Sequence, residues 1–328
     1  MLRLFCLCAL FLSVPAFSAT FDPSKAPSTL SGDDAKVAWA FREACKGQGN
    51  TVDLSARNWV LSKPIVLPET DYLCLNIVGS GYWKNVEYTQ KGYWLNVTNL
   101  KDSTWRNLGI VSSDSGIKIV CDGSSSRNVF DHLRVQCPRV GFSYEAIGNA
   151  DVSATTFRDC EWADCNVGFA ASGPNCLDLR FLGGQAQGCV VGYDLSQGGS
   201  NSVLSGIGAS GCGEVVRVNA GYQLSASFTS IELCGTAIVI GGDSAGGMGA
   251  PGAFDLAVFD CRSTPQLLDA GTGGSVTLSA LKSSGSVRLE NRSDTLTAEL
   301  NLLGAARRAS VVTVGKCKVT GQQQAVID

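Results

Sequence analysis

The sequence is poor in charged residues, in methionine and in histidine. Asp, Glu, Lys and Arg make up 17% of its 328 residues, Met occurs twice, and His132 is the single histidine. It has no basic stripe beyond Arg307-Arg308 and a formal net charge of −3, so we do not expect nucleic-acid binding. With 45% hydrophobic residues, the chain is too apolar for disorder and can bury a sizeable core.

After its first residues, the sequence lacks any uninterrupted apolar segment of membrane-spanning length, so no transmembrane helix is expected. The N-terminus has the features of a secretory signal: Arg3, a short apolar segment from Leu4 to Phe17, and small residues near Ser18. We predict that residues 1–19 are a signal peptide, with a buried N-terminal helix as the alternative. The mature protein is then expected to be secreted, periplasmic or on the cell surface.

The second half of the sequence contains a repeat that ends in cysteine. Six cysteines follow one another at intervals of 22 to 28 residues: Cys137, Cys165, Cys189, Cys212, Cys234 and Cys261. Each comes at or near the end of a short apolar segment and is soon followed, in most units, by glycine and a second apolar segment. A period in the twenties indicates a repeat architecture.

The repeat units contain no helical pattern, which argues against a leucine-rich horseshoe, and they are too short for four-stranded propeller blades. We therefore predict an all-β fold, a right-handed single-stranded parallel β-helix, over residues 50–328. Successive turns of such a solenoid pair in parallel about 4.8 Å apart.

Of the 14 cysteines, Cys6 and Cys8 lie in the predicted signal peptide and twelve remain. Cysteines in successive turns are close enough for disulfides, but their parallel Cβ atoms are poorly aimed for the bond. We predict a mostly reduced, buried cysteine ladder, with Cys160–Cys176 or Cys45–Cys74 as alternative bridges. No metal site is predicted, because a C-x-x-C pair is absent and there is one histidine.

Residues 31–46 form the one convincing helix of the sequence. Ser31 and Asp34 match a capping box, and apolar residues recur at helical spacing from Val37 to Ala44. A β-helix has an exposed end that an amphipathic helix can cover. We predict that residues 20–49 are an N-terminal segment containing this capping helix.

Residues 32–81 resemble the N-terminal part of the pectate-lyase-like superfamily, whose fold is the pectin lyase fold. The matching segments are Gly32-Asp33-Asp34-Ala35, Asn50 to Leu54, Trp59 to Pro68 and Leu73 to Gly81. This superfamily includes pectin-degrading enzymes and phage tailspike depolymerases. The resemblance implies work on polysaccharides along an exposed face of the solenoid. The motifs of polygalacturonases are absent as such, and no pectate-lyase calcium site can be assigned.

Acidic and basic side chains are concentrated in two neighbouring repeats. The catalytic candidates are Asp131, His132, Arg158, Asp159 and Glu161, with Asp178 and Arg180 one turn further. Alignment of the repeats on their phenylalanines places Asp131 beside Arg158 and makes His132 the neighbour of Asp159. Alignment on the cysteines instead places Asp131 beside Asp159. A solvated face with stacked ion pairs is the alternative interpretation.

The two enzyme classes need different groups. A hydrolase needs two carboxyl groups, about 5 Å apart for retention and 6.5–9.5 Å for inversion. A lyase of the pectate type needs carboxylates for Ca²⁺ and a basic residue that removes a proton. We therefore consider Ca²⁺ as a cofactor only for the lyase.

A second group of candidates is aromatic. Trp83, Tyr93, Trp94 and Trp105 fall within residues 82–105, and the polar residues between them indicate a carbohydrate-binding platform. Filling of the first wide turns by the same rings is an equal alternative.

These observations lead to two functional hypotheses. The first is a secreted carbohydrate-active β-helix protein, a polysaccharide lyase or glycoside hydrolase that acts on an acidic polysaccharide. The second is a non-catalytic glycan-binding adhesin or surface spike. Under either hypothesis the partner is a polysaccharide or surface glycan, and the chain can form a homotrimer. The fold alone does not decide between them.

Overall fold

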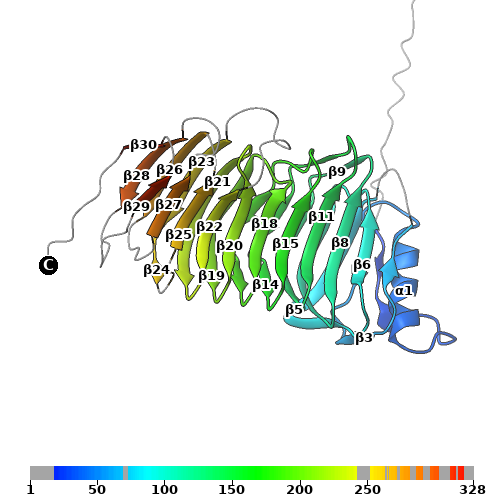
Figure 1. Ribbon diagram of the computed structural model, residues 1–328. Coiled ribbons are helices and arrows are strands. Elements are labelled where there is room, and N and C mark those ends of the chain that lie inside the picture. Colours follow the sequence, from blue (N-terminus) through cyan, green and yellow to red (C-terminus); the bar gives the residue numbers. More distant parts are fainter. Residues whose placement is uncertain are drawn as a thin grey trace, which may run out of the picture.

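The computed structural model describes residues 18–68, 73–241, 252–262, 264, 266–271, 274–280, 286–290, 296–302, 311–314 and 317–320. Within these residues the chain winds into a parallel β-solenoid of about nine turns, with one short helix near the N-terminus (Figure 1). The predicted right-handed parallel β-helix is confirmed. Residues 1–17 of the predicted signal peptide lie outside the described residues.

The strands lie in two long parallel sheets. The larger sheet contains β1 (Thr20–Phe21), β2 (Asn50–Asp53), β3 (Trp59–Leu61), β5 (Leu75–Tyr88), β7 (Thr104–Ser112), β10 (Val129–Gln136), β13 (Thr156–Arg158), β14 (Glu161–Ala163), β16 (Arg180–Leu182), β17 (Gln185–Gln187), β19 (Ser202–Ser210), β21 (Gln223–Glu232), β23 (Gly252–Val258), β24 (Cys261–Arg262), β26 (Gly274–Ala280), β28 (Leu296–Leu302) and β30 (Cys317–Thr320).

The second sheet contains β4 (Ile65–Val66), β6 (Tyr93–Thr98), β8 (Ser115–Cys121), β11 (Val140–Ala146), β15 (Val167–Ser172), β18 (Val191–Gln197), β20 (Glu214–Asn219), β22 (Thr236–Gly241), β25 (Gln266–Gly271), β27 (Ser286–Glu290) and β29 (Val311–Val314). A small sheet pairs β9 (Ser124–Ser126) with β12 (Asp151–Ser153).

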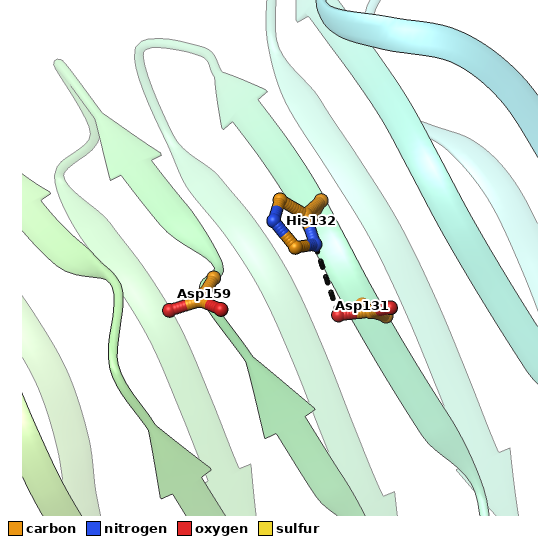
Figure 2. A group of neighbouring side chains, drawn as sticks. All are labelled: Asp131, His132 and Asp159. Atoms are coloured by element: carbon orange, nitrogen blue, oxygen red, sulfur yellow. Dashed lines mark hydrogen bonds and ion pairs between the residues drawn. The ribbon is translucent and has the colours of Figure 1, made fainter.

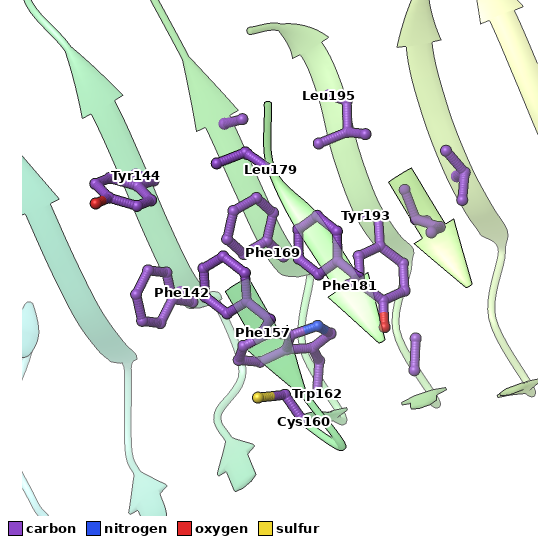
Figure 3. Packing of buried hydrophobic residues seen from close by; sticks show 14 of the residues in the cluster. Phe142, Tyr144, Phe157, Cys160, Trp162, Phe169, Leu179, Phe181, Tyr193 and Leu195 are labelled. Atoms are coloured by element: carbon purple, nitrogen blue, oxygen red, sulfur yellow. The ribbon is translucent and has the colours of Figure 1, made fainter. Parts of the chain in front are cut away.

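The core is built from columns of inward side chains, one residue per turn. In the larger sheet Phe130, Phe157 and Phe181 are direct neighbours in register. Their rings stack with centroids 4.8 Å apart at both steps. Figure 3 shows Phe157 and Phe181 within this core. The distance between the rings matches the spacing of neighbouring strands, about 4.8 Å, so the backbone repeat sets the ring stacking.

The cysteines of the repeat are buried free thiols. Among the described residues, all twelve cysteines are free, so neither of the two alternative bridges is present. The Sγ atoms of Cys137 and Cys165 lie 3.5 Å apart. Burial raises the pKa of the Cys160 and Cys176 thiols to about 12. A thiol that stays protonated packs as a small apolar group.

The helix α1 (Asp33–Ala44) follows a short 3-10 helix, η1 (Pro23–Lys25), and covers the N-terminal end of the solenoid (Figure 1). The predicted capping box is wrong, because the N-cap is Gly32 and no side chain caps it. Asp33 instead accepts a hydrogen bond from the Val60 backbone at 2.9 Å. Asp34 accepts one from the Ser62 backbone at 2.8 Å, so both acids fix the helix to the first turn.

No helix in the part of the chain that the structure describes is long and apolar enough to cross a membrane.

Candidate functional site

The larger sheet bends at one position in each of five turns, and this bend carries the candidate site. The bend residues have positive φ angles: Asn107 (54°), His132 (52°), Asp159 (47°), Gly183 (71°) and Gly206 (72°). Glycine adopts this left-handed region freely, and Asn, Asp and His tolerate it better than other residues. The local backbone therefore restricts the residue type, and two turns use the position for a side chain that can transfer protons.

Asp131, His132 and Asp159 form a compact cluster, which we call the acid–base cluster (Figure 2). The His132 Nδ1 atom lies 2.9 Å from Oδ1 of Asp131. One nitrogen or oxygen atom from each of the three residues lies within 4.8 Å of the others. His132 and Asp159 are exposed and Asp131 is half-buried, so a large polymer can reach all three.

Strand pairing decides between the two alignments of the repeats. Asp131 in β10 is the direct neighbour of Arg158 in β13, which is the alignment on phenylalanines. Asp159 follows Arg158 at the bend, so its carboxylate still reaches the group around Asp131 from the next turn (Figure 2).

Gly183 makes room for the Asp159 carboxylate. A Cβ atom built at Gly183 would collide with Oδ1 of Asp159. The carboxylate thus lies against the backbone of the following turn, at the equivalent bend position. A side chain at residue 183 would have to displace it.

Three arginines lie around the acid–base cluster. Arg106 in β7 and Arg158 in β13 pair in register with Asp131 from either side, and Arg180 lies in the next turn. All three side chains are exposed, and none makes an ion pair with another described residue. Arg106 was missed by the sequence analysis. The segment Trp105-Arg106-Asn107 could have revealed it. This segment has the same order as Phe130-Asp131-His132: an aromatic residue, then a charged residue, then the residue at the bend.

Two of the predicted catalytic residues lie apart from the acid–base cluster. Glu161 is 5% exposed, and its Oε1 accepts a hydrogen bond from Nε of Arg134 at 3.0 Å. Asp178 lies at a different corner, before β16, with a φ angle of 51°. The structure therefore brings together Asp131, His132, Arg158 and Asp159, places Arg180 nearby, and separates the other two.

The predicted aromatic platform is wrong for two of its four residues. Trp94 and Trp105 are fully buried at 0% exposure and therefore cannot contact a glycan. Trp94 packs against Phe41 of the capping helix, with ring centroids 6.3 Å apart. Tyr93 is half-buried, and the side chain of Trp83 lies outside the described residues.

The acid–base cluster does not fit a calcium site. Ca²⁺ takes six to eight oxygen ligands. Asp131 and Asp159 offer carboxylates, but the third group is the imidazole of His132. Two carboxylates and an imidazole suit a transition metal ion better than calcium.

No protein-family model matches the chain, and no curated protein sequence matches it either. Among solved structures, the catalytic unit of a thermostable GH87 α-1,3-glucanase from Streptomyces thermodiastaticus strain HF3-3 is similar, with a TM-score of 0.50 and 15% identity. The similarity covers 94% of this chain and 68% of the glucanase unit. At this identity it establishes the β-helix fold alone.

Two viral proteins are also similar at the level of the chain path. The enzymatically active domain of tailspike protein 2 from bacteriophage CBA120 has a TM-score of 0.47 and 14% identity, over 84% of this chain and 48% of that domain. ORF18 of Geobacillus virus E2 has a TM-score of 0.48 and 11% identity, over 92% of this chain and 60% of that protein. The chain thus spans about half the length of the tailspike domain.

Proposed function

We propose that the protein is a secreted carbohydrate-active enzyme that depolymerises an acidic polysaccharide at the acid–base cluster. One observation carries this proposal: His132, two carboxylates and exposed arginines from neighbouring turns meet on one outward face. Arginine binds carboxylate or sulfate through its planar fork of donors. An acidic polymer is therefore the class of substrate that this face complements.

The geometry favours a lyase. In a β-elimination, His132 removes the proton next to the carboxylate of a uronate unit, and Asp131 orients the imidazole and stabilises its charged form. Arg106 and Arg158 lie where they can neutralise the uronate carboxylate, on which negative charge develops. The C–O bond to the next sugar breaks, a double bond forms, and the leaving oxygen takes a proton from water or from the His132 imidazolium, beside which Asp159 lies.

A retaining hydrolase is the second candidate, and a specific distance favours it. The carboxylate oxygens of Asp131 and Asp159 lie within 4.8 Å of each other. That separation is nearer to the roughly 5 Å of retaining enzymes than to the 6.5–9.5 Å of inverting enzymes.

Two further observations support work on a polysaccharide. The fold is one on which the similar solved protein, an α-1,3-glucanase, is built. Residues 32–81 resemble the pectate-lyase-like superfamily, and the apolar N-terminus with Arg3 supports export.

The test is incubation of the purified protein with a panel of acidic polysaccharides. We expect new unsaturated ends, measured by ultraviolet absorbance, whereas new reducing ends without absorbance would favour the hydrolase. Asp159→Asn and His132→Gln should each lower kcat about 100-fold or more with unchanged circular dichroism. Binding of a polymer without any product would contradict the enzyme and favour the glycan-binding adhesin.

A further inference from the structure

A groove lies on the same sheet as the acid–base cluster, several turns toward the C-terminus. Its volume is about 540 Å³, and its walls come from β19, β21, β23 and β26. The polar residues that line it include Asn201, Ser202, Gln223, Ser225, Asp255 and Thr277. Its apolar lining consists of Val203, Leu224, Ala253 and Phe254, and the other lining residues carry hydrogen-bonding groups.

The polar side chains of the groove have unused hydrogen-bonding capacity. Asn201, Gln223, Ser225 and Asp255 are exposed, and within the described part of the chain their side chains make no hydrogen bond. Ser202 is different: it is 1% exposed and stands in the inward column, in register with the buried Leu224, so its side chain faces the core. The four exposed side chains suit a hydroxyl-rich ligand.

The charge of one outward column changes from basic to acidic along the solenoid. This column runs in register from Arg180 through Val203 and Ser225 to Asp255, and it continues to Glu299. No cation lines the groove among the described residues, and Asp255 is its one charged residue. A uronate carboxylate would be repelled there, whereas sugar hydroxyls can donate to Asp255.

The spacing allows one polymer to reach both places. From β13, which precedes Asp159, the pairing runs through β16, β19 and β21 to β23, which carries Asp255. Four steps between neighbouring strands span about 19 Å. An extended oligosaccharide that follows the solenoid axis can therefore occupy the acid–base cluster and the groove together.

We propose that the groove binds uncharged glycosyl units of the same chain whose uronate lies at Arg106 and Arg158. The inference rests on the proposed function and sharpens it: the substrate is an acidic heteropolysaccharide with neutral units, not a homopolymer of uronate. Gln223 and Asp255 contact the hydroxyls of the neutral unit, and the two arginines bind the acid.

The test measures binding by calorimetry in the Asp159→Asn background, so that turnover does not interfere. The probes are fragments of hyaluronan, gellan and xanthan, compared with fragments of polygalacturonate and alginate of the same length. At least one mixed polymer should bind about tenfold more tightly than either polyuronate. Ser225→Trp, which fills the groove, should remove this advantage, whereas Ser279→Trp on the exposed face of β26 should not.

A second variant inverts the charge of the groove. Asp255→Lys should strengthen binding of polygalacturonate severalfold and leave the circular dichroism spectrum unchanged, because the side chain is exposed. Equal affinity for mixed and uronate polymers, or no response to either groove variant, would overturn the inference. If the groove variants respond but the wild type cleaves no polymer, the inference stands and the proposed enzyme fails.

Discussion

The turns that carry the acid–base cluster and the turns that follow them share one backbone path but differ in side chains. In the larger sheet the inward column changes from Phe130, Phe157 and Phe181 to Leu204 and Ala226. The second sheet changes at nearly the same height, from Phe142, Phe169 and Tyr193 to Val216 and Ile238. The β-helix therefore tolerates two kinds of core, and the aromatic one lies beneath the charged face.

The bend column shows the same difference. Gly183 and Gly206 adopt positive φ without strain, whereas His132 and Asp159 pay a small conformational penalty at the equivalent place. Strained residues of this kind gather at functional sites, where the surrounding structure holds them. Glycine is the unstrained solution to the bend, and the turns that carry His132 and Asp159 instead are the ones to which we assign the proposed site.

The largest effect should come from breaking the aromatic core. Phe157→Ala should lower the free energy of unfolding by about 4 kcal/mol, because the ring is buried between Phe130 and Phe181 and leaves a large cavity. Urea unfolding followed by circular dichroism measures the change. Phe157→Leu is the matched control and should cost about 1.5 kcal/mol or less, since leucine fills the same column at Leu204. Equal losses for both variants would show that ring stacking, not volume, is what separates the two cores.

The next effect concerns the buried ion pair between Arg134 and Glu161, which belongs to the same two turns as the acid–base cluster and has no counterpart at Gln185 one turn later. Glu161→Gln should destabilise the protein by about 3 kcal/mol, because the carboxylate that accompanies the largely buried Arg134 is lost. Gln185→Ala, at the next position of the same column, should change stability by less than about 0.5 kcal/mol because Gln185 is exposed. Unfolding by urea compares the two. If Glu161→Gln keeps full stability but loses turnover, Glu161 is a catalytic residue after all.

The fold was predictable because the same residue types recur at the same position of successive repeats. Phenylalanine and cysteine recur once per turn, and a side chain that recurs at one position of a solenoid must form a column. Arg106 escaped because its turn ends in Ser112 rather than cysteine, so the cysteine repeat does not reach it. Its neighbour Trp105 was placed on the wrong face, since a shift of one residue exchanges the two faces of a strand.

The acid–base cluster was only partly predictable for a related reason. Sequence spacing alone left open which acid neighbours Asp131, and hydrogen bonding between β10 and β13 resolves it. Glu161 and Asp178 are as polar in the sequence as Asp159 is. Their separation depends on bends of the backbone at residues 159 and 178, whose positive φ angles have no distinct sequence signal for Asp.

A smaller effect should distinguish backbone strain at the bend from the role of the Asp159 carboxylate in turnover. Gly183→Ala should destabilise the protein by about 1–2 kcal/mol, from its positive φ, and should also lower turnover because the new Cβ collides with the Asp159 carboxylate. Gly206→Ala has the same φ within one degree, but nothing lies within 4 Å of the added Cβ. It should show the destabilisation without the loss of turnover. A comparison of kcat with the urea midpoint distinguishes the two variants, and equal kcat losses would contradict the role given to Asp159.

The smallest effect should come from Asp178, the acid that the structure places at another corner. Asn tolerates the left-handed backbone as well as Asp does, so Asp178→Asn should change the free energy of unfolding by less than about 0.5 kcal/mol. Asp178 precedes β16, whereas Gly183, at the bend position equivalent to Asp159, follows that strand. The two acids therefore lie at different corners of the solenoid, and kcat should stay within about twofold of the wild type. Asp159→Asn is the same chemical change at an equally exposed, left-handed position, which makes it the matched comparison. If the two variants lose turnover alike, proximity to His132 is not what selects the catalytic acid, and the site extends along the whole charged face instead.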